Sequence, residues 1–138
     1  MKIVSRKNLI NKSIGTLEHI IDMLEKLPSI RLADLKPDET ALIIVDMING
    51  FVREGALQSP RAEAIIPGIT RLSKACDKLE IKKVAFADCH STQSPEFDSY
   101  PEHCLGGTSE SEVVNEIKEI GGYTLIPKNS TNGFLEEE

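Results

Sequence analysis

Three largely apolar segments of the chain each end on an ionisable residue. They are Ala41–Val45 followed by Asp46, Lys83–Ala87 followed by Asp88, and Tyr123–Pro127 followed by Lys128. Unbroken apolar runs are typical of strands covered on both faces, as in a parallel sheet. Ligands bind outside the carboxyl ends of such strands. One charged residue there can be a helix cap or a surface group, but three at one edge of a sheet predict a functional site.

Potential metal ligands gather after the second of these segments. Asp88, Cys89 and His90 are consecutive, and Glu96 and His103 follow within the same polar stretch. At the end of a strand, Asp88 and His90 project to the same side, whereas Cys89 points away. A loop that returns to His103 would complete a site of nitrogen and oxygen ligands for a divalent metal. The alternative is that both histidines are merely solvated or hydrogen-bonded.

The first segment leads into a second candidate group. Asp46 is followed by Met47, Ile48, Asn49, Gly50 and Phe51. A carboxylate that leaves a buried strand next to an aromatic residue can act as a base beside a small apolar pocket. It can equally cap a turn.

Helical periodicity separates the predicted strands. Apolar residues recur at three- and four-residue steps from Ala62 to Leu79 and again from Ser109 to Ile120. Ser109 and Glu112 have the spacing of a capping box, and Gly121 with Gly122 provides a stop. Strands that alternate with helices predict right-handed parallel crossovers. The expected fold is therefore α/β: a three-layer, Rossmann-like parallel sheet with flanking helices.

The first 39 residues are expected to form a helical extension of the domain. An amphipathic helix is predicted from Ser13 to Leu27, and Pro28 ends it. Its apolar face requires a partner. That partner is either the flank of the same domain or another subunit of an oligomer.

Composition excludes several classes of function. The chain has 138 residues and a net charge of −6, and it carries no basic block that would bind nucleic acid. No apolar run approaches the roughly 20 residues that span a bilayer. An odd number of cysteines, Cys76, Cys89 and Cys104, in an acidic chain indicates reduced thiols inside a cell. We expect a cytoplasmic protein without a membrane partner.

The motifs taken together resemble those of the isochorismatase-like cysteine hydrolases. The segment from Asp46 to Phe51 resembles the family's D-M-Q-N-D-F motif. Asp88-Cys89-His90 resembles its D-x-H motif, and residues 100–108 resemble W-P-x-H-C-x-x-G-T, with Tyr100 in place of the commoner tryptophan. Lys128 falls where the family carries a lysine. The resemblance covers roughly residues 40–134.

The metal motif points to the nicotinamidase branch of this family. Asp88, His90 and His103 match the branch's three constant ligands, and Glu96 lies where some members place a fourth. The resemblance implies a divalent metal, such as zinc, iron or manganese, that binds the pyridine nitrogen of nicotinamide. Phe51 and Tyr100 match the aromatic positions that sandwich the substrate ring.

The resemblance also implies a covalent mechanism in which a cysteine attacks the amide and ammonia leaves, so that nicotinamide becomes nicotinate. Asp46 would be the general base, and Lys128 would lower the pKa of the thiol and keep Asp46 charged. Two alternatives remain open. The first alternative is an isochorismatase-like hydrolase that acts on another small substrate. The second is a non-catalytic remnant that binds a metal or a partner.

The family's nucleophile follows a further strand beyond the lysine, and no cysteine of this chain matches it. Cys76 lies on the apolar stripe of a predicted helix, Cys89 points away from the ligands, and Cys104 matches a non-catalytic position. Residues 40–138 are therefore expected to form a partial hydrolase domain, truncated after its third strand and inactive by itself. Its first strand would be an open apolar edge. We expect a homo-oligomer, or completion by a missing C-terminal part.

Overall fold

The computed structural model describes residues 5–135. Internal contacts divide the chain into two units, residues 1–34 and 35–138. The first unit is dominated by one long helix, α1 (Arg6–Glu25), which Ser5 caps by accepting a hydrogen bond from the backbone N–H of Asn8. The helix begins at Arg6 and not at the predicted Ser13. The prediction missed this part because the first turn is polar and shows no apolar periodicity. No residue of α1 is buried.

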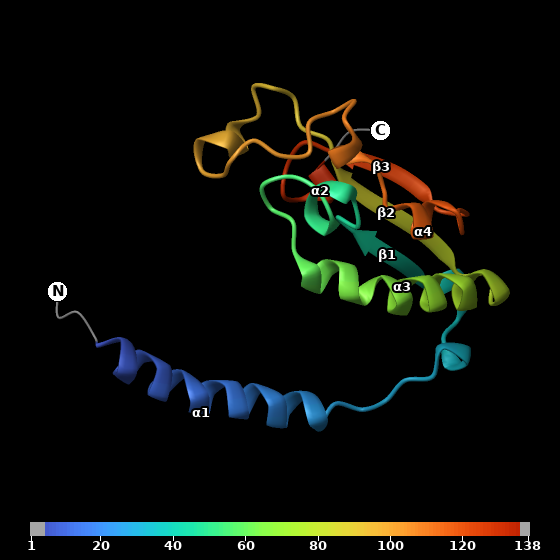
Figure 1. Ribbon diagram of the computed structural model, residues 1–138. Coiled ribbons are helices and arrows are strands. Elements are labelled where there is room, and N and C mark those ends of the chain that lie inside the picture. The colour runs from blue at the N-terminus through green and yellow to red at the C-terminus, as the bar shows by residue number, and fades with distance from the viewer. Residues whose placement is uncertain (1–4, 136–138) are drawn as a thin grey trace. The chain divides into compact units, whose positions relative to one another are not determined.

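The second unit contains a parallel sheet, as predicted. Its described strands are β1 (Ala41–Val45), β2 (Lys82–Asp88) and β3 (Thr124–Lys128), in the order β1-β2-β3 (Figure 1). Each strand lies within a residue or so of the predicted segment. The fold class predicted from the apolar runs, an α/β protein with a parallel sheet and flanking helices, is confirmed.

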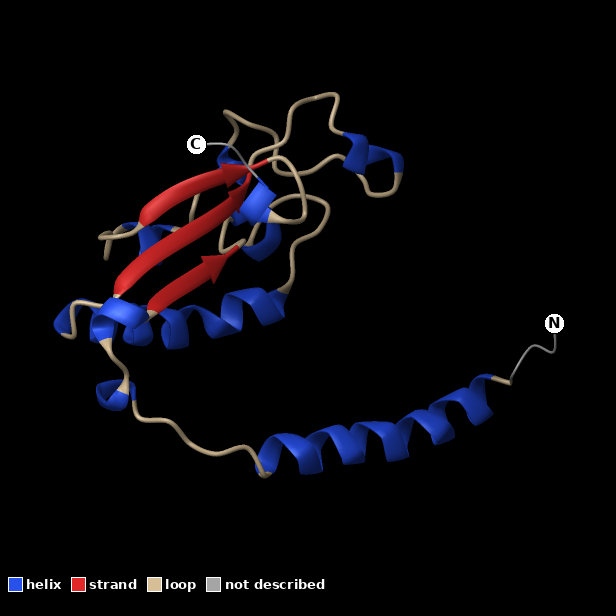
Figure 2. Ribbon diagram, turned by 180° about the vertical axis from the view of Figure 1, so that it is seen from behind, coloured by secondary structure: helices blue, strands red, loops and turns tan. Residues whose placement is uncertain are grey.

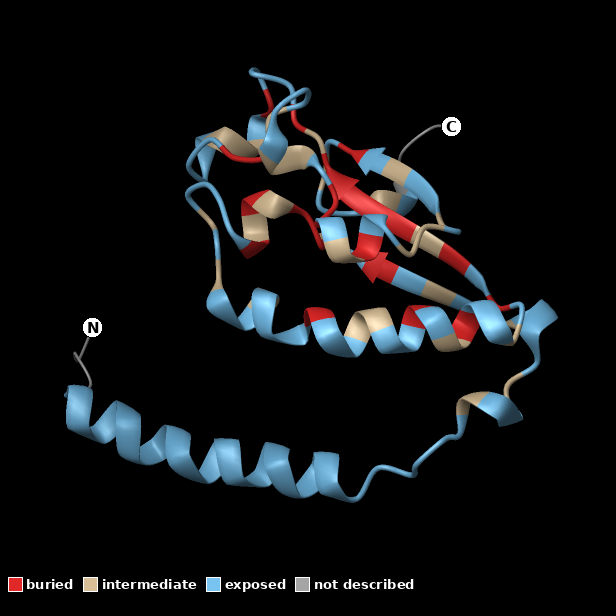
Figure 3. Ribbon diagram, turned by 45° about the vertical axis from the view of Figure 1, so that its right-hand side comes forward, coloured by how far each residue is buried: buried red, intermediate tan, exposed pale blue. Residues whose placement is uncertain are grey.

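Helix α3 (Pro60–Lys78) covers one face of the sheet and connects β1 to β2 (Figure 1). Its proline at the first helical position suits a helix start, because that N–H needs no partner within the helix. Ile66 and Cys76 are buried on its inner side, whereas Ile65 and Leu72 of the same apolar stripe are exposed. Figure 3 shows buried residues concentrated along β2 and on the side of α3 that faces the sheet.

The helix predicted from Ser109 to Ile120 is wrong. The structure has only a 3-10 turn at Ser109–Ser111 and a short helix, α4 (Asn115–Lys118). Between them Glu112 is extended (φ −85°, ψ 136°), and no side chain caps the 3-10 turn.

Tertiary hydrogen bonds replace the missing helical ones. Val113 bridges Ile48 in an antiparallel pair, and the backbone N–H of Val114 donates to the carbonyl of Met47. Val113 and Val114 are nevertheless buried, as the apolar stripe requires. The predicted stop is confirmed, because α4 is followed by two glycines with φ of 62° and 67°.

Within residues 35–135, α3 covers one face of the sheet and the second face is open. On β1, one of the two outer strands, Ile43 is 39% and Val45 53% exposed. Figure 2 shows this side, across which no long helix of residues 35–135 lies. Phe86 of β2 is the exception. Phe134 stacks on it at 5.1 Å between ring centroids, and Gly133 allows the approach, since a Cβ there would clash with the Phe86 ring.

Among the described residues, no helix is both long and apolar enough to cross a membrane.

Candidate active site and metal centre

The carboxyl edge of the sheet brings the three predicted charged residues together. Asp88 and Lys128 are register partners at the ends of β2 and β3, and Asp46 directly follows β1. The Lys128 ammonium forms an ion pair with Asp88 and lies 3.2 Å from Oδ1 of Asp46. Asp88 and Lys128 are buried, at 5% and 3% exposure. One buried cation therefore bridges two carboxylates.

Burial and mutual repulsion set the proton affinity of this group. Burial and the neighbouring Asp88 charge raise the pKa of Asp46 above its usual value, and Lys128 only partly opposes the rise. Burial acts to lower the pKa of Lys128, but its hydrogen bond to Asp88 and the charge of Asp46 outweigh it, so that pKa is raised. Lys128 is thus a fixed positive charge at neutral pH, and Asp46 is a stronger proton acceptor than an exposed aspartate.

The backbone holds Asp46 in an unusual conformation. Its φ is 55°, in the left-handed region that residues with a Cβ seldom adopt, although aspartate is among the more tolerant. Its N–H still continues the ladder of the sheet by donating to the carbonyl of Phe86 at 2.9 Å. The left-handed turn is therefore made after the last sheet hydrogen bond, at the point where the carboxylate meets Lys128.

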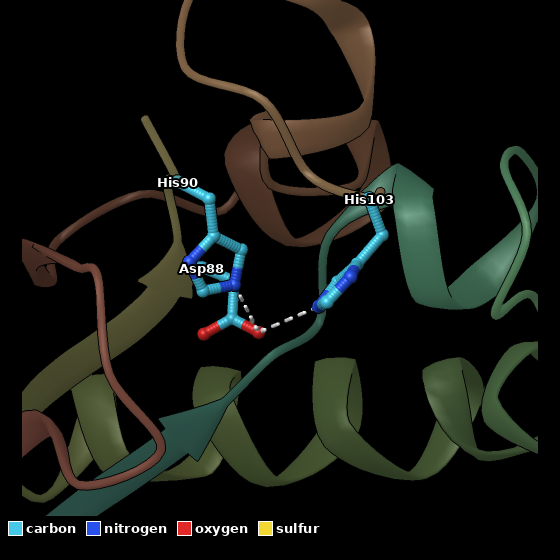
Figure 4. Close-up of side chains that lie close together, drawn as sticks. All are labelled: Asp88, His90 and His103. Carbon is cyan, nitrogen blue, oxygen red and sulfur yellow. Dashed lines mark ion pairs between the residues drawn. The ribbon is translucent and has the colours of Figure 1, made fainter. Parts of the chain in front are cut away.

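Asp88, His90 and His103 form a buried group that can hold a metal ion (Figure 4). One ligand atom from each lies within 4.8 Å of the others. Oδ2 of Asp88 is 3.5 Å from Nε2 of His90 and 4.0 Å from Nε2 of His103. The His90 Nε2 atom is buried and has no hydrogen-bond partner among the described residues. Buried polar atoms are rarely left unpaired, and an ion between these three side chains would supply the partner.

Hydrogen bonds fix which nitrogen each imidazole offers. Nδ1 of His103 donates to the carbonyl of Pro101 at 2.8 Å, which leaves the lone pair on Nε2. Nδ1 of His90 lies 3.1 Å from Oδ1 of Asn129, and the backbone N–H of Ser91 donates to the same oxygen. That oxygen is thus an acceptor, and His90 also presents the lone pair of Nε2. Such outer partners orient metal-binding histidines. The group therefore fits a divalent metal that prefers two imidazoles and a carboxylate as ligands.

Glu96 lies beside this group and not within it. It belongs to a 3-10 turn at Pro95–Asp98, and its Oε2 is 3.8 Å from Nε2 of His90. Its other oxygen accepts a hydrogen bond from Thr131 at 3.1 Å. The structure therefore brings the predicted fourth ligand to the site without assigning it a ligand position.

A pocket of about 230 Å³ joins the charged group to the metal-binding group. Its lining comprises Asp46, Phe51, Leu57, Asp88, Glu96, Tyr100, His103, Lys128 and Thr131. Both predicted ring-binding residues are among them. Phe51 contacts the imidazole of His103 at 5.7 Å between centroids, whereas Tyr100 is 57% exposed.

Four residues of the site were missed by sequence reasoning. They are Leu57, Phe97, Asn129 and Thr131. Phe97 packs its ring against both imidazoles, at 5.5 Å and 5.6 Å between centroids. Asn129 follows Lys128 directly, so its position next to a strand-end residue is the one signal that was available.

None of the three cysteines, all of them described, lines this pocket. Cys76 is buried in α3, which confirms its prediction as a core residue. Cys104 is fully buried, and burial, followed by the charges of Asp88 and Glu110, raises the pKa of its thiol to about 12. Cys89 is half-buried, and its sulfur packs toward Gly106. Burial also raises the pKa of the Cys76 thiol, so the pKa values of Cys76 and Cys104 both lie above the usual value, whereas a nucleophilic cysteine has a lowered one.

The protein is thus an open parallel α/β sheet whose carboxyl edge carries two aspartates, a lysine and two histidines. Residues 40–138 match the family model described as "Isochorismatase domain". The chain therefore belongs to the isochorismatase family, as the motifs indicated.

Curated relatives include two nicotinamidases. Nicotinamidase 1 of Arabidopsis thaliana is 31% identical over 110 residues, which is 72% of this chain and 44% of the relative. The nicotinamidase of Acinetobacter baylyi is 33% identical over 121 residues, which is 71% of this chain and 56% of the relative. The chain thus spans about half the length of these relatives.

Solved structures of amidases also align with the chain. N-carbamoylsarcosine amidase from Thermoplasma acidophilum aligns with a TM-score of 0.64 at 28% identity, covering 70% of this chain and 55% of that one. The pyrazinamidase of Pyrococcus horikoshii, solved in complex with zinc, aligns with a TM-score of 0.61 at 28% identity, covering 70% and 59%. The matched regions share the sheet that positions the site.

Proposed function

We propose that this chain carries the metal site and the acid–base group of a nicotinamidase-type amidohydrolase, which converts nicotinamide to nicotinate and ammonia. The observation that carries the proposal is one pocket bounded both by the Asp88–His90–His103 group and by the Lys128–Asp46 ion pair. Two curated nicotinamidases among the relatives support it.

In this proposal Asp88, His90 and His103 hold a divalent metal, and Glu96 supports it directly or through a water molecule. The bound metal would supply Lewis acidity that fixes the pyridine nitrogen and so orients the amide. Zinc, iron and manganese all suit the donor set. Phe51 and Tyr100 would hold the ring between them, because both line the pocket.

Asp46 would act as the general base. It would take the proton of an attacking cysteine thiol as the S–C bond forms, and return it to nitrogen as the C–N bond breaks and ammonia leaves. Water would then hydrolyse the thioester, releasing nicotinate and restoring the thiol. The raised pKa of Asp46 suits the proton transfer. Lys128 would keep both neighbouring carboxylates charged until the proton arrives.

The attacking thiol is not one of the three cysteines in this chain, because Cys76 and Cys104 are buried and Cys89 lies outside the pocket lining. We therefore propose that the 138-residue chain releases no ammonia from nicotinamide above background. Free thiols at all three positions also support a reducing, cytoplasmic location.

A chimera tests the proposal. Residues 40–138 would replace the matching part of the Acinetobacter baylyi nicotinamidase, and ammonia release from nicotinamide would be measured. The chimera is expected to turn over nicotinamide, and the Asp46→Asn change is expected to abolish turnover while leaving metal content intact. Robust turnover by the 138-residue chain alone, or full activity of the Asp46→Asn chimera, would contradict the roles assigned above.

The second candidate is a hydrolase of the same family that acts on a different small amide. The similarity to N-carbamoylsarcosine amidase favours it, since that structure aligns as well as the pyrazinamidase does. A panel of amides presented to the chimera separates the two candidates. Preference for a non-aromatic amide, together with full activity after metal removal, would select the second.

A further inference from the structure

Helix α1 presents a continuous apolar face. The side chains that form it follow alternating steps of four and three residues: Ile10, Ile14, Leu17, Ile21 and Leu24. Each of them is between 48% and 60% exposed. Such spacing is that of the contact seam of paired helices. The seam has no partner within the described part of residues 1–34.

The charges of α1 are segregated along its length. The basic residues Arg6, Lys7 and Lys12 lie in the first half, whereas the acidic residues Glu18, Asp22 and Glu25 lie in the second. The first turn contains no acidic residue and the last turn no basic one. This arrangement opposes the helix macrodipole, which favours acidic groups at the N-terminus and basic groups at the C-terminus. Within α1 these charges weaken the isolated helix, although Lys26 at its C-cap has the favourable sign.

A second copy in the antiparallel direction removes the conflict. If Ile14 lies level with Leu17 of the second copy, the helix end that carries Arg6 and Lys7 lies beside the end of the second copy that carries Asp22 and Glu25. Each positive helix end then has acidic side chains beside it. A parallel pair would place like charges together. We propose that α1 pairs with α1 of a second copy of this chain, antiparallel, through its apolar seam.

The first test measures self-association of the full 138-residue chain. Sedimentation velocity is recorded over a range of protein and salt concentrations. The wild-type chain is expected to form dimers that weaken as salt rises, because the facing charges are exposed and screened. A chain that stays monomeric across the whole range would overturn the proposal. Such a monomer is the result expected if α1 instead folds back onto its own chain.

An acidic variant tests the basic half. It carries Arg6→Glu, Lys7→Glu and Lys12→Glu. Glutamate forms helices about as well as lysine and arginine, so α1 is preserved, and circular dichroism checks this. The variant should associate at least about tenfold more weakly than wild type, because the attraction between the basic end of each helix and the acidic end of the other becomes repulsion. Unchanged association would assign the contact to another surface, such as the open face of the sheet.

A complementary basic variant carries Glu18→Lys, Asp22→Lys and Glu25→Lys. It should also associate weakly alone, and mixing it with the acidic variant should restore dimers. Absence of mixed dimers would overturn the proposal.

Orientation is tested by combining all six substitutions in one chain. In this charge-reversed chain the first half of α1 is acidic and the second half basic. In the antiparallel arrangement it is expected to dimerise with itself and to bind the wild-type chain only weakly. Preferential pairing with the wild type would show a parallel arrangement and refute the one proposed.

The matched control places the same charge change elsewhere. Arg71→Glu, Lys74→Glu and Lys78→Glu alter three exposed positions of α3 and shift the net charge equally. Association of this control is expected to equal that of wild type. An equal loss in the control would attribute the effect to overall charge and not to α1.

Discussion

At the carboxyl edge of the sheet, charged side chains are buried, whereas across the open face of the same sheet, apolar side chains are exposed. Lys128 is 3% exposed, and Val45 is 53% exposed. Buried charges persist only where they are paired, and here one lysine joins two carboxylates. Exposed apolar patches mark interaction surfaces. The two regions therefore differ in how their unfavourable groups are compensated: charges at the edge are paired within the domain, whereas the apolar side chains of the open face have no cover within residues 35–135.

The sharpest way to break this comparison is a pair of substitutions in adjacent residues. Ile44→Lys places an unpaired charge in the core on the α3 side, where Ile44 is 3% exposed. We expect a loss of at least about 4 kcal/mol in the free energy of unfolding, measured with urea. Val45→Lys, on the open face, is expected to change it by less than about 0.5 kcal/mol. Similar losses at both positions would show that the face is covered.

Lys128→Met breaks the balance at the edge. The cation is lost, and the buried Asp88 and the half-buried Asp46 are left together without it, which is expected to cost about 3–5 kcal/mol in the free energy of unfolding. Urea titration in the presence of a chelator measures it. Lys82→Met, at the exposed start of β2, is the matched control and should change little. Equal effects of the two substitutions would mean that the ion pairs contribute no stability.

Asn129→Ala tests the outer support of the metal site. Loss of the acceptor that orients His90 is expected to weaken zinc binding by about 10–100-fold without abolishing it. Calorimetric titration with zinc measures the change. Asn132→Ala, on the exposed loop beyond it, serves as the control. Unaltered affinity in Asn129→Ala would remove Asn129 from the site.

The thiols give the smallest expected signal. The pKa of Cys104 is raised to about 12, so its thiol stays protonated at pH 8 and the reactive thiolate forms only at far higher pH. Alkylation of the folded chain with iodoacetamide, followed by peptide mass spectrometry, should therefore modify Cys89 first and spare Cys104 and Cys76. Rapid modification of Cys104 at pH 8 would reopen the question of a nucleophile within this chain.

Prediction from sequence succeeded where the signal is local. The strands and the charges that end them follow from apolar runs and from the residue after each run, so Asp46, Asp88 and Lys128 were placed correctly at one edge. The helix expected at residues 109–120 failed because the backbone of Val113 and Val114 bonds to the segment after β1, a contact that no local pattern encodes. An apolar run such as β1 also has the same sequence pattern whether one face of the strand or both faces are covered, so the pattern does not predict how many faces are covered.

Binding of zinc to the 138-residue chain tests the central claim that Asp88, His90 and His103 form a metal centre. Calorimetry is expected to show one zinc ion per chain for the wild type and for His19→Ala, which alters the exposed histidine of α1. His90→Ala and His103→Ala are each expected to abolish this binding. A wild-type chain that binds no zinc, or binding that survives both substitutions, would contradict the account.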